Sequence, residues 1–510
     1  MESRLQAEAL LGGANAVRVV VPADLAATRR AFRLVFPGVI GTMFLAAVDQ
    51  TILATALPAI SASFGGFADL SWVAVAYLLA ATVTAPLYGH LGDRFGRRRM
   101  LLAALAVFTL GSVACAAAPT FAALSGGRAL QGLGGGGLMS LSQALISEHV
   151  PPRERARFQG YFAAVFAVSS TLGPVLGGYL TEHLSWRAVF AINLPLAAGA
   201  ALLTLRIPQS RQSGNGQFHL DVPGTVLFFA SATAFLFALG SAGHRLAWNS
   251  PMILTLVAGA ALGFAALVWW ERRAVDPVIP VRLLAIPAIL RTNSMVFCFA
   301  GALFAAVLYL PLYLQVGRGF GIGESGLLLL PITLTIALAS TLTGKLISST
   351  GRLTVFPAAG LALSTLAFAV LAATLSTAPT PLVLALITAA AAGLGTVMPA
   401  SQIIVQDSAG NNALGSATAA VSVSRSLGAA FGVALVGALL YLLIGRHDAV
   451  AADLLQHVPQ NGAAYSGLLP GASSAIAADL NRAFHVVFAV LATLTAIGSA
   501  LALSVPRRRI

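Results

Sequence analysis

Two charged side chains stand alone inside long apolar stretches of this 510-residue chain. Asp49 is the only acidic residue of the stretch 36–58, and Arg128 is the only basic residue of the stretch 121–147. A charge in such a stretch is expensive in hydrocarbon unless it faces a cavity or a partner, so both are candidates for function. Burial favours the neutral form of a carboxyl group and a nearby guanidinium favours its charged form. We therefore expect Asp49 to load and release a proton beside Arg128; the alternative is a static ion pair that orients two helices.

The depths of these charges place them at one level of a membrane. At ~1.5 Å of helix per residue, Asp49 lies roughly 20 Å from one boundary and Arg128 roughly 12 Å from the opposite one. The two depths add to about one hydrocarbon thickness of ~30 Å, so the side chains can meet. Arg425, roughly 18 Å deep, falls in the same layer, although a lone arginine can also bind carbonyl oxygens of a neighbouring helix. The candidates for contact with a substrate or for coupling are Gln50, Gln131, Asn193 and Arg425.

A cluster of glycine, aspartate and arginine follows the second apolar stretch, from Gly89 to Arg99. We expect a short loop here whose charges pair across two halves of the protein and with helix ends, so that making and breaking these pairs gates one side. The alternative is plain anchoring by basic residues at the cytosolic face. The residues expected to form this gate are Gly89, Asp93, Arg94, Gly96, Arg97 and Arg98.

The fifth apolar stretch contains a proline set among glycines. Proline removes a helical hydrogen bond, and glycine lets helices approach closely. We expect a bend and tight packing at this point, against the alternative of ordinary small-residue packing. The residues of this motif are Gly173, Pro174, Gly177 and Gly178.

The elements that must position these residues are membrane-spanning helices. The chain is 58% hydrophobic and 9% charged, which excludes a soluble enzyme and a disordered protein, and its two cysteines exclude a disulfide scaffold. Uncharged stretches divided at proline and glycine breaks predict an all-α integral membrane protein with fourteen transmembrane helices. They lie near 36–58, 71–90, 100–118, 121–147, 158–181, 187–205, 222–243, 250–270, 292–315, 325–347, 354–375, 381–404, 413–444 and 483–505.

The distribution of the 30 basic residues fixes the expected orientation, because most of them fall on one side if the N-terminus is cytosolic. Gly89, Gly96 and Arg97 recur in spacing as Gly344, Gly351 and Arg352, which favours two repeated halves with a site between them. We expect two six-helix, pseudo-symmetric bundles around a two-helix insert in an alternating-access transporter. The expected parts are a cytosolic tail (1–33), the N-terminal bundle (34–206), the insert with its linkers (207–290), the C-terminal bundle (291–505) with an outer loop (446–482), and a basic cytosolic C-terminus (506–510).

Several other activities are excluded by the sequence. Residues 132–137 formally satisfy the dinucleotide-binding pattern GxGxxG, but they lie in a predicted span with no preceding strand. No Walker sequence for ATP and no HExxH spacing for zinc occurs. The basic residues form no single water-facing patch for nucleic acid. We therefore expect no cofactor, no metal, no nucleic-acid partner and no enzymatic activity.

Taken in order along the chain, these motifs resemble the major facilitator superfamily and, within it, the fourteen-span drug:proton antiporters. In the second half Ser424 to Gly432 and Leu328 to Pro331 resemble the family's thirteenth and tenth spans, but Ser348 stands where the first half has Asp93. The segments of the first half that carry the resemblance are Leu45 to Thr51, Gly89 to Arg99, Arg128 to Gly132, Gly173-Pro174 with Gly177-Gly178, and Trp186 to Pro195.

The resemblance implies a proton-coupled multidrug exporter of hydrophobic, cationic or amphiphilic compounds in the cytoplasmic (inner) membrane of a bacterium. Its partners would be these substrates, protons and membrane lipid, and the proton gradient would be its energy source; no sequence feature supports accessory export components. The alternatives are an exporter of a lipid or other native amphiphile, an importer or facilitator of a metabolite, and a non-transporting membrane receptor.

Overall fold

The computed structural model describes residues 33–64, 70–150, 152–208, 221–241, 249–274, 281–314, 318, 320, 322–410, 413–443 and 474–506. Within these ranges the chain forms helices and no strand. The predicted N-terminal tail up to residue 32, the outer segment 446–473 and the basic residues 507–510 lie outside the described ranges.

Every predicted span overlaps a helix or a pair of consecutive helices. The helices before the linkers are α3 (Phe36–Phe64), α4 (Leu70–Phe95), α5 (Arg97–Ala116), α6 (Phe121–His149), α7 (Pro152–His183), α8 (Ala188–Ala191) and α9 (Asn193–Thr204). The predicted insert contains α10 (Val222–Ser241) and α11 (Pro251–Glu271). The remaining helices are α12 (Val281–Leu284), α13 (Pro287–Leu312), α14 (Ile322–Thr350), α15 (Val355–Thr374), α16 (Thr380–Gly395), α17 (Val397–Ala409), α18 (Leu414–Leu443) and α20 (Ser474–Ser504).

Ten stretches of helix among the described residues are long and apolar enough to cross a membrane. They belong to α3, α5, α10, α11, α13, α14, α15, α16 with α17, α18 and α20. The pair α8 and α9 forms a shorter apolar stretch. The other predicted spans coincide with α4, α6 and α7, which carry the charged and glycine-rich motifs and are therefore less apolar.

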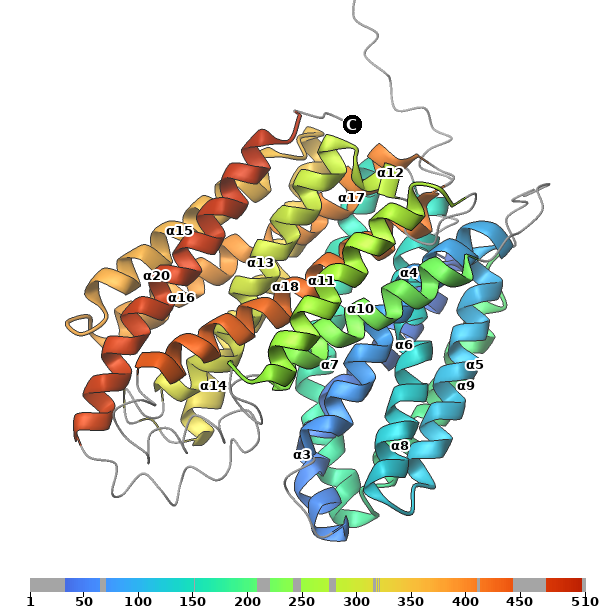
Figure 1. Ribbon diagram of the computed structural model, residues 1–510, viewed down its shortest axis with the longest axis horizontal. Coiled ribbons are helices and arrows are strands. Elements are labelled where there is room, and N and C mark those ends of the chain that lie inside the picture. The colour runs from blue at the N-terminus through green and yellow to red at the C-terminus, as the bar shows by residue number, and fades with distance from the viewer. Residues whose placement is uncertain are drawn as a thin grey trace, which may run out of the picture.

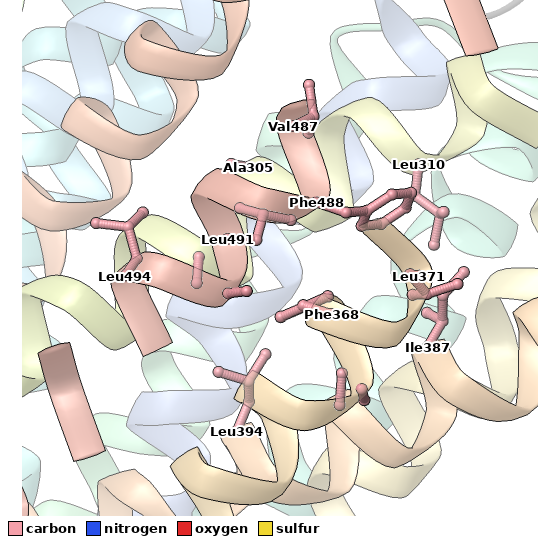
Figure 2. Packing of buried hydrophobic residues seen from close by; sticks show 14 of the residues in the cluster. Ala305, Leu310, Phe368, Leu371, Ile387, Leu394, Val487, Phe488, Leu491 and Leu494 are labelled. Atoms are coloured by element: carbon pink, nitrogen blue, oxygen red, sulfur yellow. The ribbon is translucent and has the colours of Figure 1, made fainter. Parts of the chain in front are cut away.

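The helices gather into two bundles that touch at one end and diverge toward the other (Figure 1). In the first, hereafter the N half, α3 packs on α7, α6 and α9, while α6 packs on α4 and α5. In the second, the C half, α13 packs on α18 and α20, and α15 packs on α20 and α16. Figure 2 shows the core of the C half, where Phe368 of α15, Leu394 of α16 and Phe488 of α20 lie together. The helices α10 and α11 pack on each other and contact α4 and α18.

The structure corrects four predicted boundaries. The expected loop after the second span is a single residue, Gly96, because α4 continues to Phe95 and α5 begins at Arg97; Gly96 makes this turn with a φ of 93°. The predicted sixth span is broken at Ile192 and the twelfth at Thr396. Proline explains both breaks, since neither Pro195 nor Pro399 has an N–H for the carbonyl four residues earlier. The predicted outer loop ends earlier than residue 482, because α20 begins at Ser474.

The glycines of the excluded GxGxxG pattern are packing residues. A Cβ at Gly136 would lie 3.0 Å from the Ala81 carbonyl carbon of α4, and a Cβ at Gly134 would lie 2.8 Å from the Phe108 Cα of α5. These glycines let α6 contact the backbones of both neighbours, which is how small residues associate membrane helices. This close contact carries Arg128 and Gln131 of α6 into the middle of the N half.

Two glycine substitutions in α6 separate the packing role from helix propensity. Gly136→Ala places a methyl group against α4, so we expect it to lower the midpoint of thermal unfolding, since overpacking costs ~1–3 kcal/mol. The control Gly126→Ala adds a methyl group where nothing described lies within 4 Å, and we expect a small rise from helix propensity of ~1 kcal/mol. Unfolding of the purified protein, followed by fluorescence, checks both; equal shifts would contradict the packing role.

Candidate functional site

A buried ion pair forms the centre of the N half. Nη1 of Arg128 on α6 donates to Oδ2 of Asp49 on α3 over 2.7 Å. Each residue is 1% exposed. The predicted meeting of the two charges at one level of the membrane is therefore observed, and neither charge faces lipid.

Amide side chains complete the surroundings of the carboxylate. Nε2 of Gln131 donates to Asp49 Oδ1 over 2.8 Å, and Nδ2 of Asn193, at the start of α9, donates to the same oxygen over 2.7 Å. The Ser112 hydroxyl of α5 accepts from Gln131 Nε2 over 2.8 Å. Three donors from two helices, α6 and α9, thus hold one carboxylate, and two of them belong to Gln131 and Asn193, which were predicted as candidates for substrate contact or coupling.

The guanidinium of Arg128 has its own supports. Its Nε donates to the Val73 carbonyl of α4 over 3.1 Å, and its Nη1 also donates to Gln131 Oε1 over 2.6 Å. The Tyr77 ring lies 4.4 Å from its central carbon and the Phe190 ring 6.0 Å. The carbonyl and the ring faces therefore offset part of the charge of the guanidinium, in addition to the Asp49 carboxylate.

Two predicted residues lie outside this network. Gln50 is exposed and makes none of the described hydrogen bonds to the Asp49 carboxylate, although it lies close to Tyr77, whose ring packs on Arg128. Arg425 lies on α18 of the C half, where it is half-buried and makes no hydrogen bond or ion pair with any described residue. It is thus not a carbonyl-bound arginine in the described part of the chain.

A second constellation joins the two halves at the end where α4 meets α18. Asp93 of α4 accepts three hydrogen bonds from the first turn of α18: from the Gly415 N–H (2.8 Å), the Ser416 N–H (2.9 Å) and the Ser416 hydroxyl (3.2 Å). A helix N-terminus carries a partial positive charge, so it favours this carboxylate. A Cβ at Gly89 would lie 2.6 Å from the Gly415 carbonyl oxygen, so only glycine permits the contact. We call the contact of Gly89 and Asp93 with the start of α18 the latch.

Two arginines of the predicted gate bind residues of the N half, and one of them, Arg97, holds Asp93 in place. Arg97, 1% exposed, donates from Nη2 to Asp93 Oδ1 (2.6 Å) and from Nη1 to Glu148 of α6 (2.8 Å). Arg98 donates to the Leu205 carbonyl over 2.7 Å. Arg94 is half-buried beside Asp93 in the chain. Asp93 pairs across the halves with a helix end, as expected of this cluster, and Arg98 binds a helix end within the N half, at the C-terminus of α9.

Further contacts between the halves lie at the same end. Ser147 of α6 donates to Gln406 of α17 over 2.7 Å, and Ser348 of α14 donates to Glu154 of α7 over 3.2 Å. Ser348 occupies the position in the second repeat that Asp93 occupies in the first. It also contacts the first turn of a helix in the other half, but here the carboxylate belongs to that helix, as Glu154 of α7. Arg155, next to Glu154, donates to the Val150 carbonyl over 2.8 Å. Burial lowers the pKa of the Arg155 guanidinium to about 10, opposed by nearby Asp407 and assisted by Arg97, so it stays charged at neutral pH.

The proline motif of α7 supports the helix that carries Asp49. The helix is continuous from Pro152 to His183. A Cβ at Gly173 would lie 3.1 Å from the Ile52 nitrogen of α3, and the Thr51 hydroxyl donates to the Ser169 carbonyl over 2.9 Å. Gly177 is buried, whereas a Cβ at Gly178 would meet nothing described within 4 Å. Close packing is therefore found at Gly173 and not at Gly178.

Comparison with known proteins agrees with this architecture. The profile of the Major Facilitator Superfamily matches residues 39–433. This chain belongs to the Major Facilitator Superfamily. An uncharacterized superfamily transporter of Mycobacterium tuberculosis is 37% identical over 416 residues, covering 81% of this chain and 60% of the relative. The multidrug transporter protein MdtP of Bacillus subtilis is 31% identical over 449 residues, covering 88% of this chain and 80% of the relative. The human organic anion transporter MFSD10 has the same fold, with a TM-score of 0.63, 17% identity and coverage of 92% and 99%.

Superfamily membership confirms that the chain is a multi-pass membrane transporter and not an enzyme.

Sequence reasoning missed several residues of the site. Ser112, Tyr77 and Glu148 are small, aromatic or helix-end residues of types that are common in any membrane helix, so only the fold reveals their role. One sequence feature pointed to Glu148: this acid lies on the side of the membrane where most arginines are predicted, so it could pair with one of them, as it does with Arg97.

A double-mutant cycle tests whether Asp49 and Arg128 hold each other in place. Asp49→Asn and Arg128→Gln each leave one buried charge without its counter-charge, so we expect each to destabilise by ~3–5 kcal/mol. The double variant should destabilise less than the sum of the two. Thermal unfolding of the purified variants gives the comparison, with exposed Glu182→Gln as the control. Strictly additive losses would show that the pair is not coupled.

Spin labels test the latch. Asp93→Asn removes the charge that α18 holds, so we expect the end bearing the latch to open more often. Labels at Arg206→Cys and Val355→Cys, both exposed at that end, should move to longer mean distances in double electron-electron resonance. The native Cys115 and Cys298 are buried, which limits background labelling. Unchanged distances in Asp93→Asn, with Glu182→Gln as control, would rule the latch out.

Proposed function

We propose that this protein is a fourteen-span, proton-coupled antiporter that exports hydrophobic and amphiphilic compounds by alternating access. We place it in the cytoplasmic membrane of a bacterium with both termini in the cytosol, so that the latch closes the cytosolic side. The observation that carries the proposal is the buried carboxylate of Asp49, held by donors from α6 and α9 with no lipid contact. The name of the 31%-identical relative, a multidrug transporter, supports efflux as the direction.

The geometry supports a specific proton step. A proton that reaches Asp49 neutralises the carboxylate and weakens its bonds to Arg128, Gln131 and Asn193, since charge-assisted hydrogen bonds are about twice as strong as neutral ones. These bonds join α3 to α6 and α9. Protonation therefore loosens α3 against its neighbours, and loss of the proton tightens the contact again. A substrate that binds better to one of these two arrangements is exchanged against the proton.

The contacts between the halves assign the described conformation to one step of the cycle. Asp93, Ser147 and Ser348 all make their contacts at the end where α4 meets α18. In the proposed orientation this is the cytosolic end, so the conformation is the one closed to the cytosol. A ligand can shift such an equilibrium only through unequal affinity for the two conformations. In the proposed cycle Asp49 takes up its proton from the outside in this conformation.

Proton flux in sealed proteoliposomes tests the proposal. The liposomes carry an interior pH dye and receive a panel of lipophilic cations, anions and neutral amphiphiles. We expect substrate-driven proton movement in the wild type and none in Asp49→Asn, because an amide cannot carry the proton. Binding of the same compounds to Asp49→Asn shows that the variant is folded.

Two outcomes would contradict the proposal. Equal proton movement in the wild type and in Asp49→Asn would leave Asp49 a structural residue. Uptake of a compound with no proton movement in either protein would indicate a facilitator.

A further inference from the structure

The C half contains a charge that no residue described by the structure neutralises. Arg425 lies near the middle of α18, roughly 16 Å from its first residue at ~1.5 Å per residue. It is half-buried and has no hydrogen bond or ion pair with any residue that the structure describes. The other arginines in the body of the helices differ: Arg128 is paired with Asp49, and Arg97 with Asp93 and Glu148. An uncompensated cation at this depth is costly, so it requires a partner in at least one state of the transporter.

Two buried amide side chains of the C half also lack hydrogen-bond partners among the described residues. Asn293 of α13 is 6% exposed and Gln402 of α17 is 0% exposed. Within the described ranges, neither the amide nitrogen nor the amide oxygen of either side chain has a hydrogen-bond partner. A buried polar group left unsatisfied costs ~1–3 kcal/mol, so such groups are rare and point to a ligand or a function. Asn193 and Gln131 of the N half, by contrast, are bound to Asp49.

The three side chains lie on helix faces that meet. Ile289 and Val296 of α13, Val405 of α17, and Ala417 and Val421 of α18 form one buried cluster. Residues three or four apart share a face of a helix. Asn293 is therefore on the face of α13 that bears Ile289 and Val296. Gln402 is on the face of α17 that bears Val405, and Arg425 on the face of α18 that bears Val421. The three polar groups thus converge where α13, α17 and α18 pack together.

The chemistry of these groups selects an acid. A guanidinium offers five N–H donors and no acceptor, and each amide adds two N–H donors. Arginine is the side chain best suited to bind a carboxylate or phosphate through two parallel hydrogen bonds. Phe297, one turn beyond Asn293 on α13, packs against Phe431 of α18 with ring centroids 5.4 Å apart, which provides an apolar surface next to the polar groups. The site therefore has a cationic end and an apolar side.

We propose that Arg425, Asn293 and Gln402 bind the acidic head group of the transported substrate, and that the preferred cargo is an amphiphilic anion with an apolar tail. This inference rests on the proposed function, because it names the substrate class of that transporter. An anionic cargo takes the place of the cationic cargo that the family resemblance implied. The Asp49 carboxylate is held by three donors and is not free to bind a cationic compound in the described conformation. The bound acid would supply the counter-charge that Arg425 lacks and acceptors for the two amides.

Direct binding tests the inference without transport. The probe is dansyl-11-aminoundecanoic acid, compared with its neutral methyl ester, on the full-length protein in nanodiscs with empty nanodiscs subtracted. We expect the wild type to bind the acid at least about tenfold more tightly than the ester. Arg425→Gln should lose most of this preference and still bind the ester, and Arg425→Lys should retain part of it. The matched control, Arg272→Gln, removes an exposed charge from the end of α11 and should keep the preference.

The amide variants separate binding from support of the fold. Asn293→Leu and Gln402→Leu remove unsatisfied groups from an apolar cluster, so we expect a higher unfolding midpoint without ligand and weaker binding of the acid. A structural role would instead lower the midpoint. An unchanged ratio of acid to ester affinity in Arg425→Gln would overturn the inference. So would a wild type that prefers the dansyl amine of the same chain length.

Failure of this inference is distinguishable from failure of the proposed function. If cations and neutral amphiphiles drive proton movement but anions do not, antiport stands and the anion site is wrong. If the acid binds through Arg425 but no compound drives proton movement, the anion site stands and proton coupling is wrong.

Discussion

A charge inside hydrocarbon must find its counter-charge within the protein, and the N half is built around that constraint. Asp49 and Arg128 are 2.7 Å apart and almost completely buried. To surround them, α3, α6 and α9 must each bring one donor or acceptor to the same point, while α4 supplies a carbonyl and a ring. The glycines of α6 allow this, since side chains at Gly134 and Gly136 would separate the helices whose polar groups must meet. Charge neutralisation and close packing are thus two requirements of one arrangement.

The buried pair and the latch share two helices, α4 and α6. Val73 and Tyr77 of α4 contact Arg128, and Asp93 of the same helix contacts α18. Those two contacts are roughly 30 Å apart along a helix that rises ~1.5 Å per residue. The helix α6 repeats the pattern, because it carries Arg128 in the membrane and Glu148 beside Arg97. In the proposed cycle, a change in the bonds around Asp49 therefore acts on the same helices that hold the latch. This coupling needs no chain of small displacements, because α4 and α6 each reach both sites.

The predictable part of this structure is the part that hydrocarbon dictates. Each of the fourteen predicted stretches coincides with helix, because an apolar stretch of that length must satisfy its own backbone. The meeting of Asp49 and Arg128 followed from depth alone. What failed depended on contacts between helices: α4 continues to Phe95, where Asp93 reaches the start of α18, and Gln50 makes no described hydrogen bond to the Asp49 carboxylate. The role of Ser112 was invisible for the same reason, since a serine has no preferred partner until the fold brings one close, and Glu148 was recognisable only as an acid on the arginine-rich side.

The two halves share a fold but use polar residues differently. In the N half, α6 presents Arg128 and Gln131 to an acid of the same half, and each of the two side chains is hydrogen-bonded. In the C half, α17 presents Gln402 and α18 presents Arg425, but no described acid meets either of them. At the latch the asymmetry recurs, with Asp93 on one side and Ser348 on the other. If the charges of both halves were neutralised within the protein, neither half would gain electrostatic free energy by binding a charged compound. In the proposed cycle the N half, where Asp49 meets Arg128, carries the proton, and the C half, where Arg425 has no acid among its described partners, recognises the cargo. Under that proposal the difference in charge between the halves separates the two ligands that an antiporter exchanges.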